Sequence, residues 1–446
     1  MSELVKYRST RGGEDDLSFE DVLLSGLARD GGLYVPEYWP RFSYEKLCQM
    51  KNLDYSSLAS EIIAPFVGSN LKKVIKSISK SVYSNFCNQD VAPLVKLKKN
   101  LYVMELFHGP TLAFKDYAMQ YLSELFDEVL LQKKKKIVIL GATSGDTGSA
   151  ALEAFKSKKN SDIFILFPYN RVSPVQQKQM TSINEQGSQA IALRTDFDGC
   201  QNIVKALFSD IEFRDKVSLS AVNSINWARL IPQIVYYFYG AFKVGAPEKE
   251  VIFSVPTGNF GNILSGWIAS KMGLPIKKLI CGSNQNDVLT RFFNTGKMQR
   301  SNVIPSLSPS MDIQVSSNFE RFLYEVINRD SERLNFLMDS FEKDSFYKLE
   351  DKELKKALNY FESYSIKDSD ILQTTRYVYE QNNYLIDPHT SVGVKAAFLA
   401  QVQGRVNDEV PIVSLACAHP SKFPDTIYKS MSFYPKIPSR LNSKKC

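Results

Sequence analysis

Residues 137–155 read IVILGATSGDTGSAALEAF, and this stretch decides the class of fold. The apolar run 137–140 is typical of a buried strand, a loop of glycine, serine and threonine follows it, and residues 150–155 continue as a helix. Strands that alternate with helices in this way predict an α/β fold, with mostly parallel sheets covered by helices on both faces. Further apolar runs of this kind occur at 163–167, 190–193, 251–255 and 276–281.

The length of the chain predicts more than one lobe. A protein of 446 residues is too long for one simple hydrophobic core. The run Val91-Ala92-Pro93-Leu94 has the composition of a hinge, which would close a first lobe. The predicted divisions are an N-terminal lobe (1–92), a smaller α/β domain (131–220) and a large domain (93–130 and 221–446) with a charged helical insertion at about 326–365.

Composition excludes several classes of protein. The net charge of +7 is a mild excess spread over the chain, which fits small anionic ligands but not a nucleic-acid-binding surface. The six cysteines have neither disulfide-framework nor zinc-site spacing, and no other pattern predicts a metal. The N-terminus lacks the apolar core of a signal peptide, and no window approaches the roughly 18 apolar residues of a membrane helix. We therefore expect a soluble, cytoplasmic protein without membrane or nucleic-acid partners.

The stretch HGPTLAFKDYA, residues 108–118, places a lysine among apolar neighbours at the start of a helix. Burying an ammonium group is costly, because its charge loses the surrounding water. One interpretation of Lys115 is an ordinary surface lysine. The other is an amine held near its neutral form, ready to attack a carbonyl group.

Two glycine-rich loops follow predicted strands, and ligands of parallel α/β sheets bind at such places. The loop 141–148, GATSGDTG, has the spacing G-x-x-x-G-x-x-G rather than that of dinucleotide folds, so it is either an anion cradle or a tight turn. The loop 256–262, PTGNFGN, suits a phosphate group but lacks the ending of a nucleotide P-loop. Each motif alone is a weak signal.

A third cluster, NSINWAR at 223–229, groups amides, a hydroxyl and a guanidinium. Asn226 and Arg229 are three residues apart and would share a helical face. The arginine fork suits a phosphate or a carboxylate, although a surface salt bridge is the alternative. A reactive lysine, two anion-binding loops and this cluster together fit one cofactor, pyridoxal phosphate, whose aldehyde condenses with a lysine amine.

The chain resembles the threonine synthases of fungi and many bacteria, within the fold-type-II family of pyridoxal-phosphate enzymes. The similar blocks occur in the order of the family from one end of the chain to the other. They are 7–12, 27–33, 105–118, 141–150, 172–176, 223–229, 256–262, 308–312, 387–390 and 418–423.

The resemblance implies roles for individual residues. Lys115 would hold the cofactor covalently as a Schiff base and act as the catalytic base. The cofactor phosphate would bind to Gly258, Asn259, Phe260, Gly261 and Asn262, and the hydroxyl of Thr390 would face the pyridine nitrogen. The substrate would bind to Thr143, Ser144, Gly145, Asp146 and Thr147 through its α-carboxylate, and to Asn226 and Arg229 through its phosphate.

The implied reaction converts O-phospho-L-homoserine and water into L-threonine and phosphate. Lys115 would remove the Cα proton, it or a relay would then remove a Cβ proton so that the electrons expel phosphate from Cγ, and water would add at Cβ. A phospho-lyase on the same scaffold would instead release 2-oxobutyrate, ammonia and phosphate, and a non-catalytic cofactor-binding relative is a further alternative. A monomer is expected on the resemblance alone.

Overall fold

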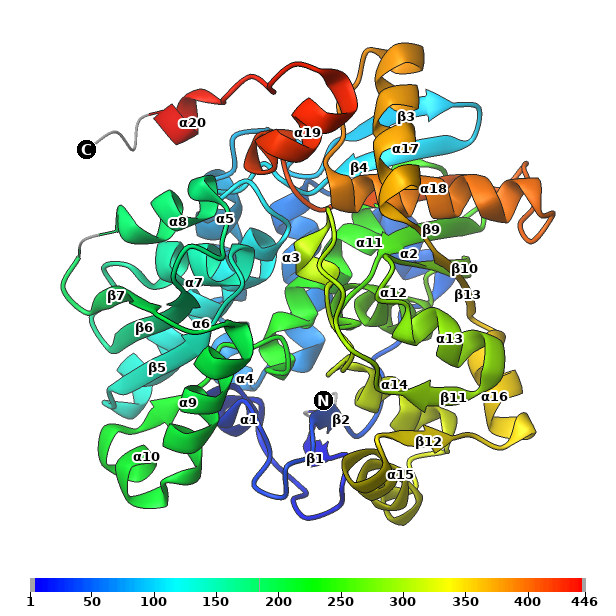
Figure 1. Ribbon diagram of the computed structural model, residues 1–446. Coiled ribbons are helices and arrows are strands. Elements are labelled where there is room, and N and C mark those ends of the chain that lie inside the picture. Colours follow the sequence, from blue (N-terminus) through cyan, green and yellow to red (C-terminus); the bar gives the residue numbers. More distant parts are fainter. Residues whose placement is uncertain (1–4, 184, 443–446) are drawn as a thin grey trace.

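A computed structural model describes residues 5–183 and 185–442 and contains two largely parallel sheets (Figure 1). Each pair of neighbouring strands is parallel except β3 and β4, which form an antiparallel pair at one edge of the larger sheet. The larger sheet has the order β13 (Phe361–Ser365), β10 (Ile276–Ser283), β9 (Val251–Pro256), β14 (Ile412–Ala416), β4 (Leu101–Glu105) and β3 (Leu94–Lys98). The smaller sheet has the order β7 (Ser188–Leu193), β6 (Ser161–Pro168), β5 (Ile137–Ala142) and β8 (Leu219–Ser220).

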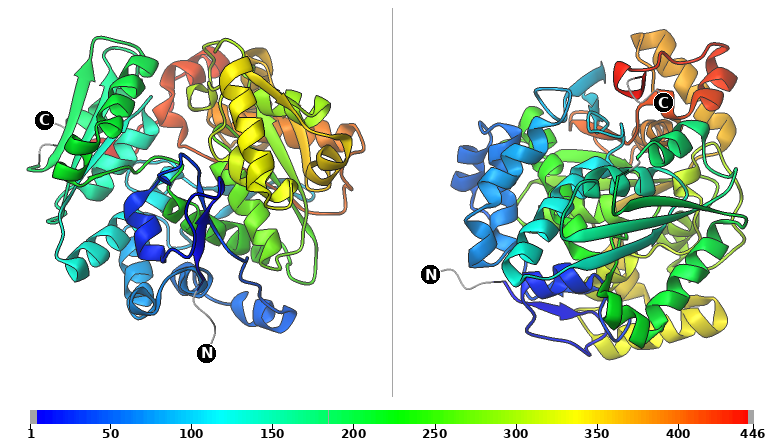
Figure 2. Two further views of the ribbon diagram at one scale, coloured as in Figure 1. Left: turned by 90° about the horizontal axis from the view of Figure 1, so that it is seen from below. Right: turned by 90° about the vertical axis from the view of Figure 1, so that its left-hand side faces the viewer.

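The smaller sheet is covered on both faces, as its sequence pattern predicts. Side chains along a strand point alternately to opposite faces. Ile139 of β5 belongs to the main core together with Phe155 of α7, whereas the next residue, Leu140, packs in a separate cluster with Cys200 and Val204 of α9. Helices α7 and α9 therefore cover opposite faces of this sheet. The right-hand view of Figure 2 shows the sheet at an oblique angle.

The larger sheet is surrounded by the remaining helices. Every residue of β9 is buried, as expected for a strand in the interior of a parallel sheet. Helix α11 is buried continuously from Ile231 to Ala241, because it contacts α3, α6 and α12. The helices after the N-terminal lobe are α6 (Lys115–Lys133), α7 (Asp146–Phe155), α8 (Pro174–Thr181), α9 (Phe197–Ser209), α10 (Ile211–Val217), α11 (Ile231–Lys243), α12 (Gly261–Lys271), α13 (Val288–Thr295), α14 (Phe319–Val326), α15 (Ser331–Asp344), α16 (Asp351–Leu358), α17 (Asp368–Asn382), α18 (Pro388–Val402), α19 (Pro424–Met431) and α20 (Ser439–Asn442).

The segment 326–365, expected to be helical, is only partly so. It contains α15 and α16 but also β12 (Phe346–Lys348), which pairs with β11 (Lys297–Gln299), and it ends in β13. Strand β13 is the edge of the larger sheet and pairs in parallel with β10. Its sequence FESYS mixes polar and aromatic residues, because an edge strand is half exposed and lacks the apolar run of an interior strand.

The N-terminal residues form a small antiparallel two-stranded sheet and a layer of helices beside the two larger sheets. In the left-hand view of Figure 2, the strands β1 and β2 lie between the two halves of the molecule. Ser18 caps the first helix through a reciprocal capping box with Asp21. The elements are β1 (Tyr7–Ser9), α1 (Phe19–Ser25), β2 (Tyr34–Pro36), α2 (Tyr44–Met50), α3 (Tyr55–Ile63), α4 (Ser69–Lys72) and α5 (Ile75–Ser84).

Arg321 of α14 ties the N-terminal residues to the rest of the chain. Its side chain is buried and donates to the carbonyl oxygens of Tyr34 at 2.8 Å and Ile225 at 2.5 Å, and to Asn318 Oδ1 at 2.5 Å. Burial lowers the pKa of Arg321 to about 9. Within the described residues, no helix is both long and apolar enough to cross a membrane.

We expect Arg321→Met to lower the free energy of unfolding by at least about 2 kcal/mol, because several buried oxygen acceptors lose a charged donor. The measurement is the shift of the denaturation midpoint. Lys277→Met is the control, since it removes an exposed ion pair with Glu250 (N–O 3.1 Å) and should cost less than about 1 kcal/mol. Equal shifts for both variants would contradict the anchoring role of Arg321.

Candidate active site

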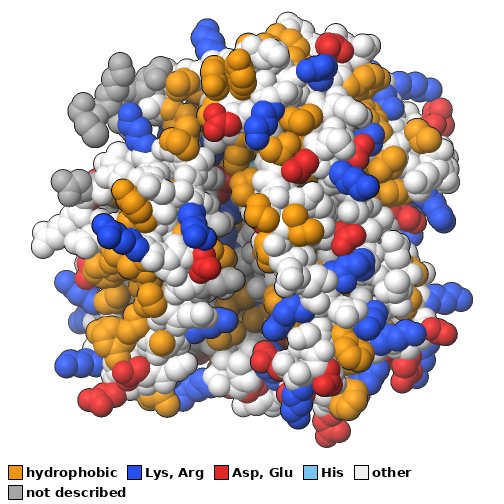
Figure 3. Space-filling view, viewed as in Figure 1, with side chains coloured by type: hydrophobic (Ala, Val, Ile, Leu, Met, Phe, Trp, Pro, Cys, Tyr) orange, Lys and Arg blue, Asp and Glu red, His pale blue; other side chains and the backbone are white. Residues whose placement is uncertain are grey.

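The candidate active site lies where the carboxyl ends of strands from both sheets approach each other. Loops after β4, β5, β9 and β14 lead to this place, as expected for ligand sites of parallel sheets. Figure 3 shows a groove between the half of the molecule that holds the smaller sheet and the half that holds α13 to α16, with basic side chains deep inside it.

Lys115 is the first residue of α6 and its side chain is only 13% exposed. The preceding turn is held by Asp116, whose carboxylate accepts the N–H of Thr111 at 2.8 Å and its hydroxyl at 2.7 Å. Leu112 in this turn has φ 60°, a conformation that costs energy for a bulky residue and is typical of functional sites. The turn therefore fixes the direction in which the lysine enters the site.

The pKa of Lys115 is lowered, chiefly because burial disfavours its charged form. Asp146 acts in the opposite direction, with Oδ2 at 4.0 Å from the Lys115 Nζ. The positive charges of Lys422 and Arg229 add to the lowering. The surroundings thus favour the neutral amine that nucleophilic and general-base chemistry requires.

Asp146 lies within the predicted glycine-rich loop 141–148 and is the first residue of α7. Its Oδ1 is 2.6 Å from Lys422 Nζ and accepts Gln176 Nε2 at 2.8 Å. Burial alone would raise the pKa of Asp146, but the Lys422 and Lys115 charges outweigh it and hold that pKa well below the usual range. Asp146 is therefore a buried carboxylate that stays ionised.

The other residues of this loop divide into two groups. The hydroxyl oxygen of Thr143 accepts the N–H groups of Gly145 at 3.0 Å and Gly148 at 2.8 Å, so it shapes the start of α7. Ser144 is exposed and Thr147 is partly exposed. The two outer hydroxyls are therefore open to a substrate, while Thr143 supports the loop from inside.

The loop 257–260 forms the predicted phosphate cradle before α12. Phe260 has φ 62°, and this turns the peptide groups of the loop. The carbonyl oxygen of Gly258 accepts Ser316 Oγ at 2.8 Å, and that of Asn259 accepts the Asn318 side chain at 3.1 Å. Among the hydrogen bonds of the described residues, the N–H groups of 258–260 have no acceptor. An oxyanion at the start of α12 would satisfy them.

Asn262 tests whether this place fits the phosphate of a cofactor. Tyr236 and Tyr237 donate to its Oδ1 at 2.7 and 2.9 Å. Its Nδ2 is buried and has no partner among residues 5–183 and 185–442. A buried amide donor without an acceptor costs about 1–3 kcal/mol, and a bound phosphate oxygen would remove that cost. The donors present therefore fit the group.

Thr390 is connected to the same cluster through the start of α18. Its hydroxyl donates to Asp387, the residue that caps this helix. Asp387 also contacts His389 Nδ1 at 2.9 Å, and His389 Nε2 accepts the N–H of Ser310 at 3.2 Å. Ser310 Oγ in turn lies 3.5 Å from Asp146 Oδ2. A continuous series of contacts therefore connects Thr390 to Asp146, the carboxylate beside Lys115.

Asn226 and Arg229 differ in whether their side chains keep a hydrogen-bond donor without a partner among the described residues. Asn226 donates to the carbonyls of Leu23 and Ala221 and accepts the N–H of Ala228, so its side chain is engaged within the protein. Arg229 is buried, donates to the Val222 carbonyl at 3.1 Å and has an unpartnered Nε among the described residues. Burial lowers the pKa of Arg229 to about 10. Arg229 is the better candidate for binding an anion.

Three contributors to the site carry no predicted role, although their sequence blocks are prominent. They are Lys422, Ser310 and Gln176, all of which contact Asp146. A signal for Lys422 exists in the sequence, since it lies between Pro420 and Phe423 shortly after an apolar strand. The sequence does not show which residue Lys422 would pair with, because that residue, Asp146, lies 276 positions earlier in the chain.

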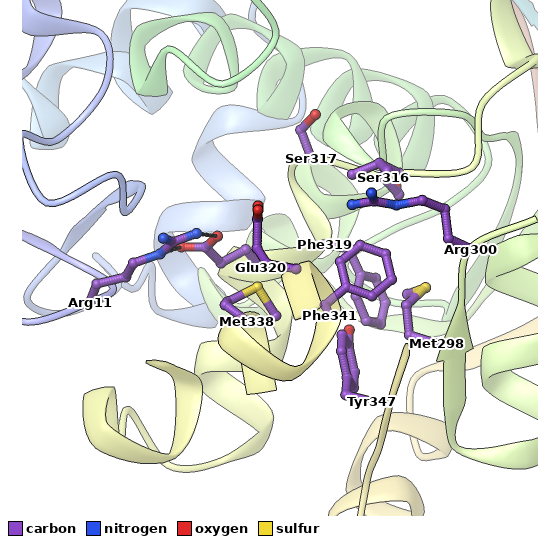
Figure 4. A pocket seen from close by; sticks show the side chains of 12 residues that line it. Arg11, Met298, Arg300, Ser316, Ser317, Phe319, Glu320, Met338, Phe341 and Tyr347 are labelled. Carbon is purple, nitrogen blue, oxygen red and sulfur yellow. Dashed lines mark hydrogen bonds and ion pairs between the residues drawn. The ribbon is translucent and has the colours of Figure 1, made fainter. Parts of the chain in front are cut away.

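A second cavity, of about 130 Å³, lies between the N-terminal residues and α15 (Figure 4). Arg11 and Glu320 form an ion pair of 3.1 Å on one side, and Phe319, Met298 and Tyr347 contribute to the lining. Lys115 is not among its lining residues. This cavity is therefore separate from the cluster around Asp146.

Comparison with known proteins agrees with this geometry. Residues 6–83 match the family described as threonine synthase N terminus, 89–336 the pyridoxal-phosphate dependent enzymes, and 390–444 the threonine synthase C-terminal family. Threonine synthase from Pseudomonas aeruginosa is 47% identical over 439 residues, which are 98% of this chain and 93% of the relative. The chain belongs to the threonine synthase family.

Solved structures of threonine synthases have the same fold. The crystal structure of the PLP-bound threonine synthase from Brucella melitensis is 45% identical, with a TM-score of 0.95 over 99% of this chain and 94% of that one. The yeast threonine synthase structure is 38% identical, with a TM-score of 0.93 over 98% and 93%. The prediction of a fold-type-II pyridoxal-phosphate enzyme is confirmed.

Membership of the threonine synthase family settles the cofactor and the class of reaction. The cofactor is pyridoxal 5'-phosphate, and the activity is that of a pyridoxal-phosphate-dependent lyase, threonine synthase. The phospho-lyase alternative is not favoured, because the relatives named threonine synthase are 39–47% identical over nearly the whole chain.

We expect Asn262→Asp to weaken binding of pyridoxal phosphate to the apoenzyme at least about tenfold. The carboxylate keeps the acceptor for Tyr236 and Tyr237 but replaces the free donor by an anion, and about 1.4 kcal/mol of lost binding energy is tenfold in affinity. Titration followed by fluorescence measures the dissociation constant. Asn359→Asp, on the exposed end of α16, is the control. Unchanged affinity in Asn262→Asp would exclude a phosphate at this side chain.

His419, next to the threonine synthase site, makes the stability of the fold depend on pH. Its Nδ1 accepts the N–H of Ser421 at 3.2 Å and contacts its hydroxyl at 2.8 Å. Burial lowers the pKa of His419 from 6.5 to about 4. The unfolded chain therefore binds a proton between these pH values that the folded chain does not bind.

The stabilisation linked to His419 should be complete above pH 6.5 and be lost as the pH falls towards 4. We expect His419→Asn, which keeps an acceptor for Ser421, to abolish about 2–3 kcal/mol of this pH dependence. Thermal denaturation of both proteins at pH 7.5, 6, 5 and 4.5 measures the difference. Parallel curves for the two proteins would show that folding does not shift the pKa of His419.

Proposed function

We propose that the chain converts O-phospho-L-homoserine and water into L-threonine and inorganic phosphate, with Lys115 as its catalytic residue. The observation that carries this proposal is the buried amine of Lys115 at 4.0 Å from Asp146, in a cluster whose Ser310 lies beside Gly258 of the phosphate cradle. Comparison with threonine synthases supports the same reaction.

The cofactor would be held at three places. Lys115 would bind it covalently, Gly258, Asn259, Phe260, Gly261 and Asn262 would surround its phosphate, and Thr390 would face its pyridine nitrogen. The hydroxyl of Thr390 donates to Asp387, so its oxygen can accept a hydrogen bond from a protonated pyridine nitrogen, whereas an unprotonated nitrogen would require this hydroxyl to donate to it instead. When bound, pyridoxal phosphate supplies an electron sink for the bonds that break at the substrate carbons.

The protein residues position the substrate and move its protons. The neutral amine of Lys115 accepts the proton from Cα, and burial keeps that amine uncharged beforehand. Ser144, Gly145 and Thr147, on the frame provided by Thr143 and Asp146, bind the α-carboxylate. Arg229 binds the substrate phosphate and stabilises the charge that develops as this group leaves from Cγ. Asn226 supports Arg229 from the same turn.

The organisation of the molecule completes the proposal. All four strands of the smaller sheet lie within 131–220, which supports the division into an N-terminal lobe (1–92), that smaller domain, and a large domain of 93–130 and 221–446.

We propose that the protein acts as a monomer in the cytoplasm. The five cysteines among the described residues are free thiols, as a reducing compartment maintains them; Cys446 lies outside these residues.

Product analysis tests the reaction directly. Incubation of the holoenzyme with O-phospho-L-homoserine should release one threonine for each phosphate. The phospho-lyase reaction would release 2-oxobutyrate and ammonia instead. Equal amounts of phosphate and 2-oxobutyrate without threonine would replace the proposed activity by that alternative, and no phosphate at all would favour a non-catalytic relative.

Lys115→Ala should lower turnover by about 10²–10⁴-fold or more, because the reaction loses its general base. Borohydride reduction followed by peptide mapping should find the cofactor on Lys115 in the wild-type protein and on no peptide of the variant. Lys133→Ala, at the far end of the same helix and about 27 Å away along its axis, is the control and should keep wild-type turnover. Retention of the reduced cofactor in Lys115→Ala would refute the assignment.

A further inference from the structure

Lys422 is a second lysine in the site, and it is fully buried. It lies in the segment after β14, which runs beside the turn that leads to Lys115: the N–H of Phe114 bonds to the Cys417 carbonyl at 2.8 Å. The ammonium group is 2.6 Å from Asp146 Oδ1 and donates to the Thr111 carbonyl at 2.9 Å. A lysine without solvent contact requires such partners, since its charge has lost its hydration.

The two oxygens of Asp146 are used unequally. Oδ1 has the short contacts, with Lys422 at 2.6 Å and Gln176 Nε2 at 2.8 Å. Among the described residues, Oδ2 makes only longer contacts, with Ser310 Oγ at 3.5 Å and Lys115 Nζ at 4.0 Å. An opposite charge within about 4–6 Å favours the charged form of a lysine. Without a closer cation, Asp146 would pair with Lys115 and hold a proton on its amine.

We propose that Lys422 is a positioning residue: it takes the carboxylate of Asp146 into an ion pair of its own, so that the amine of Lys115 stays free of its proton. The inference rests on the role proposed above for Lys115. Because Lys422 also bonds to Thr111, it holds the carboxylate and the turn before Lys115 in one arrangement.

Four groups act electrostatically on the amine of Lys115: Asp146, Lys422, Arg229 and Cys417. Burial raises the pKa of the Cys417 thiol, so it is neutral near pH 7. Among these four groups, the charges near pH 7 are therefore one negative and two positive. The buried carboxyl of Asp116, whose pKa burial raises to about 6, directly follows Lys115 in the chain and interacts with Lys422. Loss of Lys422 leaves one negative and one positive group. It also leaves Asp146, 4.0 Å from the amine, without its ion-pair partner. Loss of Asp146 instead leaves two positive groups.

These charges predict signs that differ between variants. Lys422→Met should raise the pKa of Lys115 by about 1–3 pH units, because Asp146 remains as its unpaired neighbour. Asp146→Asn should lower it or leave it unchanged. The double variant, which removes both charges, should return the pKa of Lys115 to within about half a pH unit of the wild-type value, and Lys422→Arg should keep it there.

The experiment uses the apoenzyme, so that its outcome does not depend on turnover. Trace acetylation with acetic anhydride over a range of pH, followed by quantitative mass spectrometry of the Lys115 peptide, gives the pKa of this one lysine. Lys133 is the internal reference, and Lys429→Met is the control variant, because Lys429 is exposed on α19 in the same segment. In the holoenzyme, the acidic limb of the kcat/KM profile should shift in the same direction as the acetylation pKa.

An unchanged pKa of Lys115 in Lys422→Met, or equal pKa values in the single and the double variant, would overturn the proposal. A higher KM for phosphohomoserine with an unmoved pH profile would likewise overturn it, and would make Lys422 a ligand of the substrate. If Lys422→Met does not fold, the double variant still decides, since it buries no unpaired charge: a pKa of Lys115 far from the wild-type value would contradict the ion-pair account. Failure of the proposed reaction would appear in the products, not in these pKa values.

Discussion

The buried carboxylate of Asp146 is the constraint on which the site depends. A charge that has lost its water must be paired and hydrogen-bonded. The partners of Asp146 come from separate parts of the chain: Lys422 follows β14, Gln176 is on α8, and Ser310 precedes α14. Because the carboxylate sits on α7 of the smaller sheet while Lys422 extends from the larger one, this ion pair connects the two sheets beside Lys115.

The phosphate cradle depends on a second chain of contacts, which reaches the N-terminal residues. Asn318 accepts Arg321 through its Oδ1 and donates to the Asn259 carbonyl through its Nδ2. Arg321 in turn donates to the Tyr34 carbonyl. With the carbonyls of 258–259 bound in this way, the N–H groups of the loop are left for an anion. The N-terminal two-stranded sheet therefore supports the cofactor site although it contributes no residue to the cradle.

Local sequence patterns predicted the parts of the site that one strand, loop and helix can form. Residues 137–155 show the strand, the glycine loop and the helix start in order, and Lys115 stands out because its neighbours are apolar. Lys422 and Ser310 could not be assigned in this way, since their contacts with Asp146 join residues 276 and 164 positions apart. Strand β13 was missed for a different reason: an edge strand has no continuous apolar run.

The electrostatics of the site answer two requirements that appear to conflict. A substrate with a carboxylate and a phosphate needs positive surroundings, whereas a general base must be free of its proton. Positive neighbours serve both, because Arg229 and Lys422 disfavour a proton on Lys115 and also attract anions. The one buried carboxylate would oppose both effects if it were left alone. The short ion pair with Lys422 offsets the negative charge of Asp146. Asp146 can therefore shape the loop 141–148 without favouring the protonated form of Lys115.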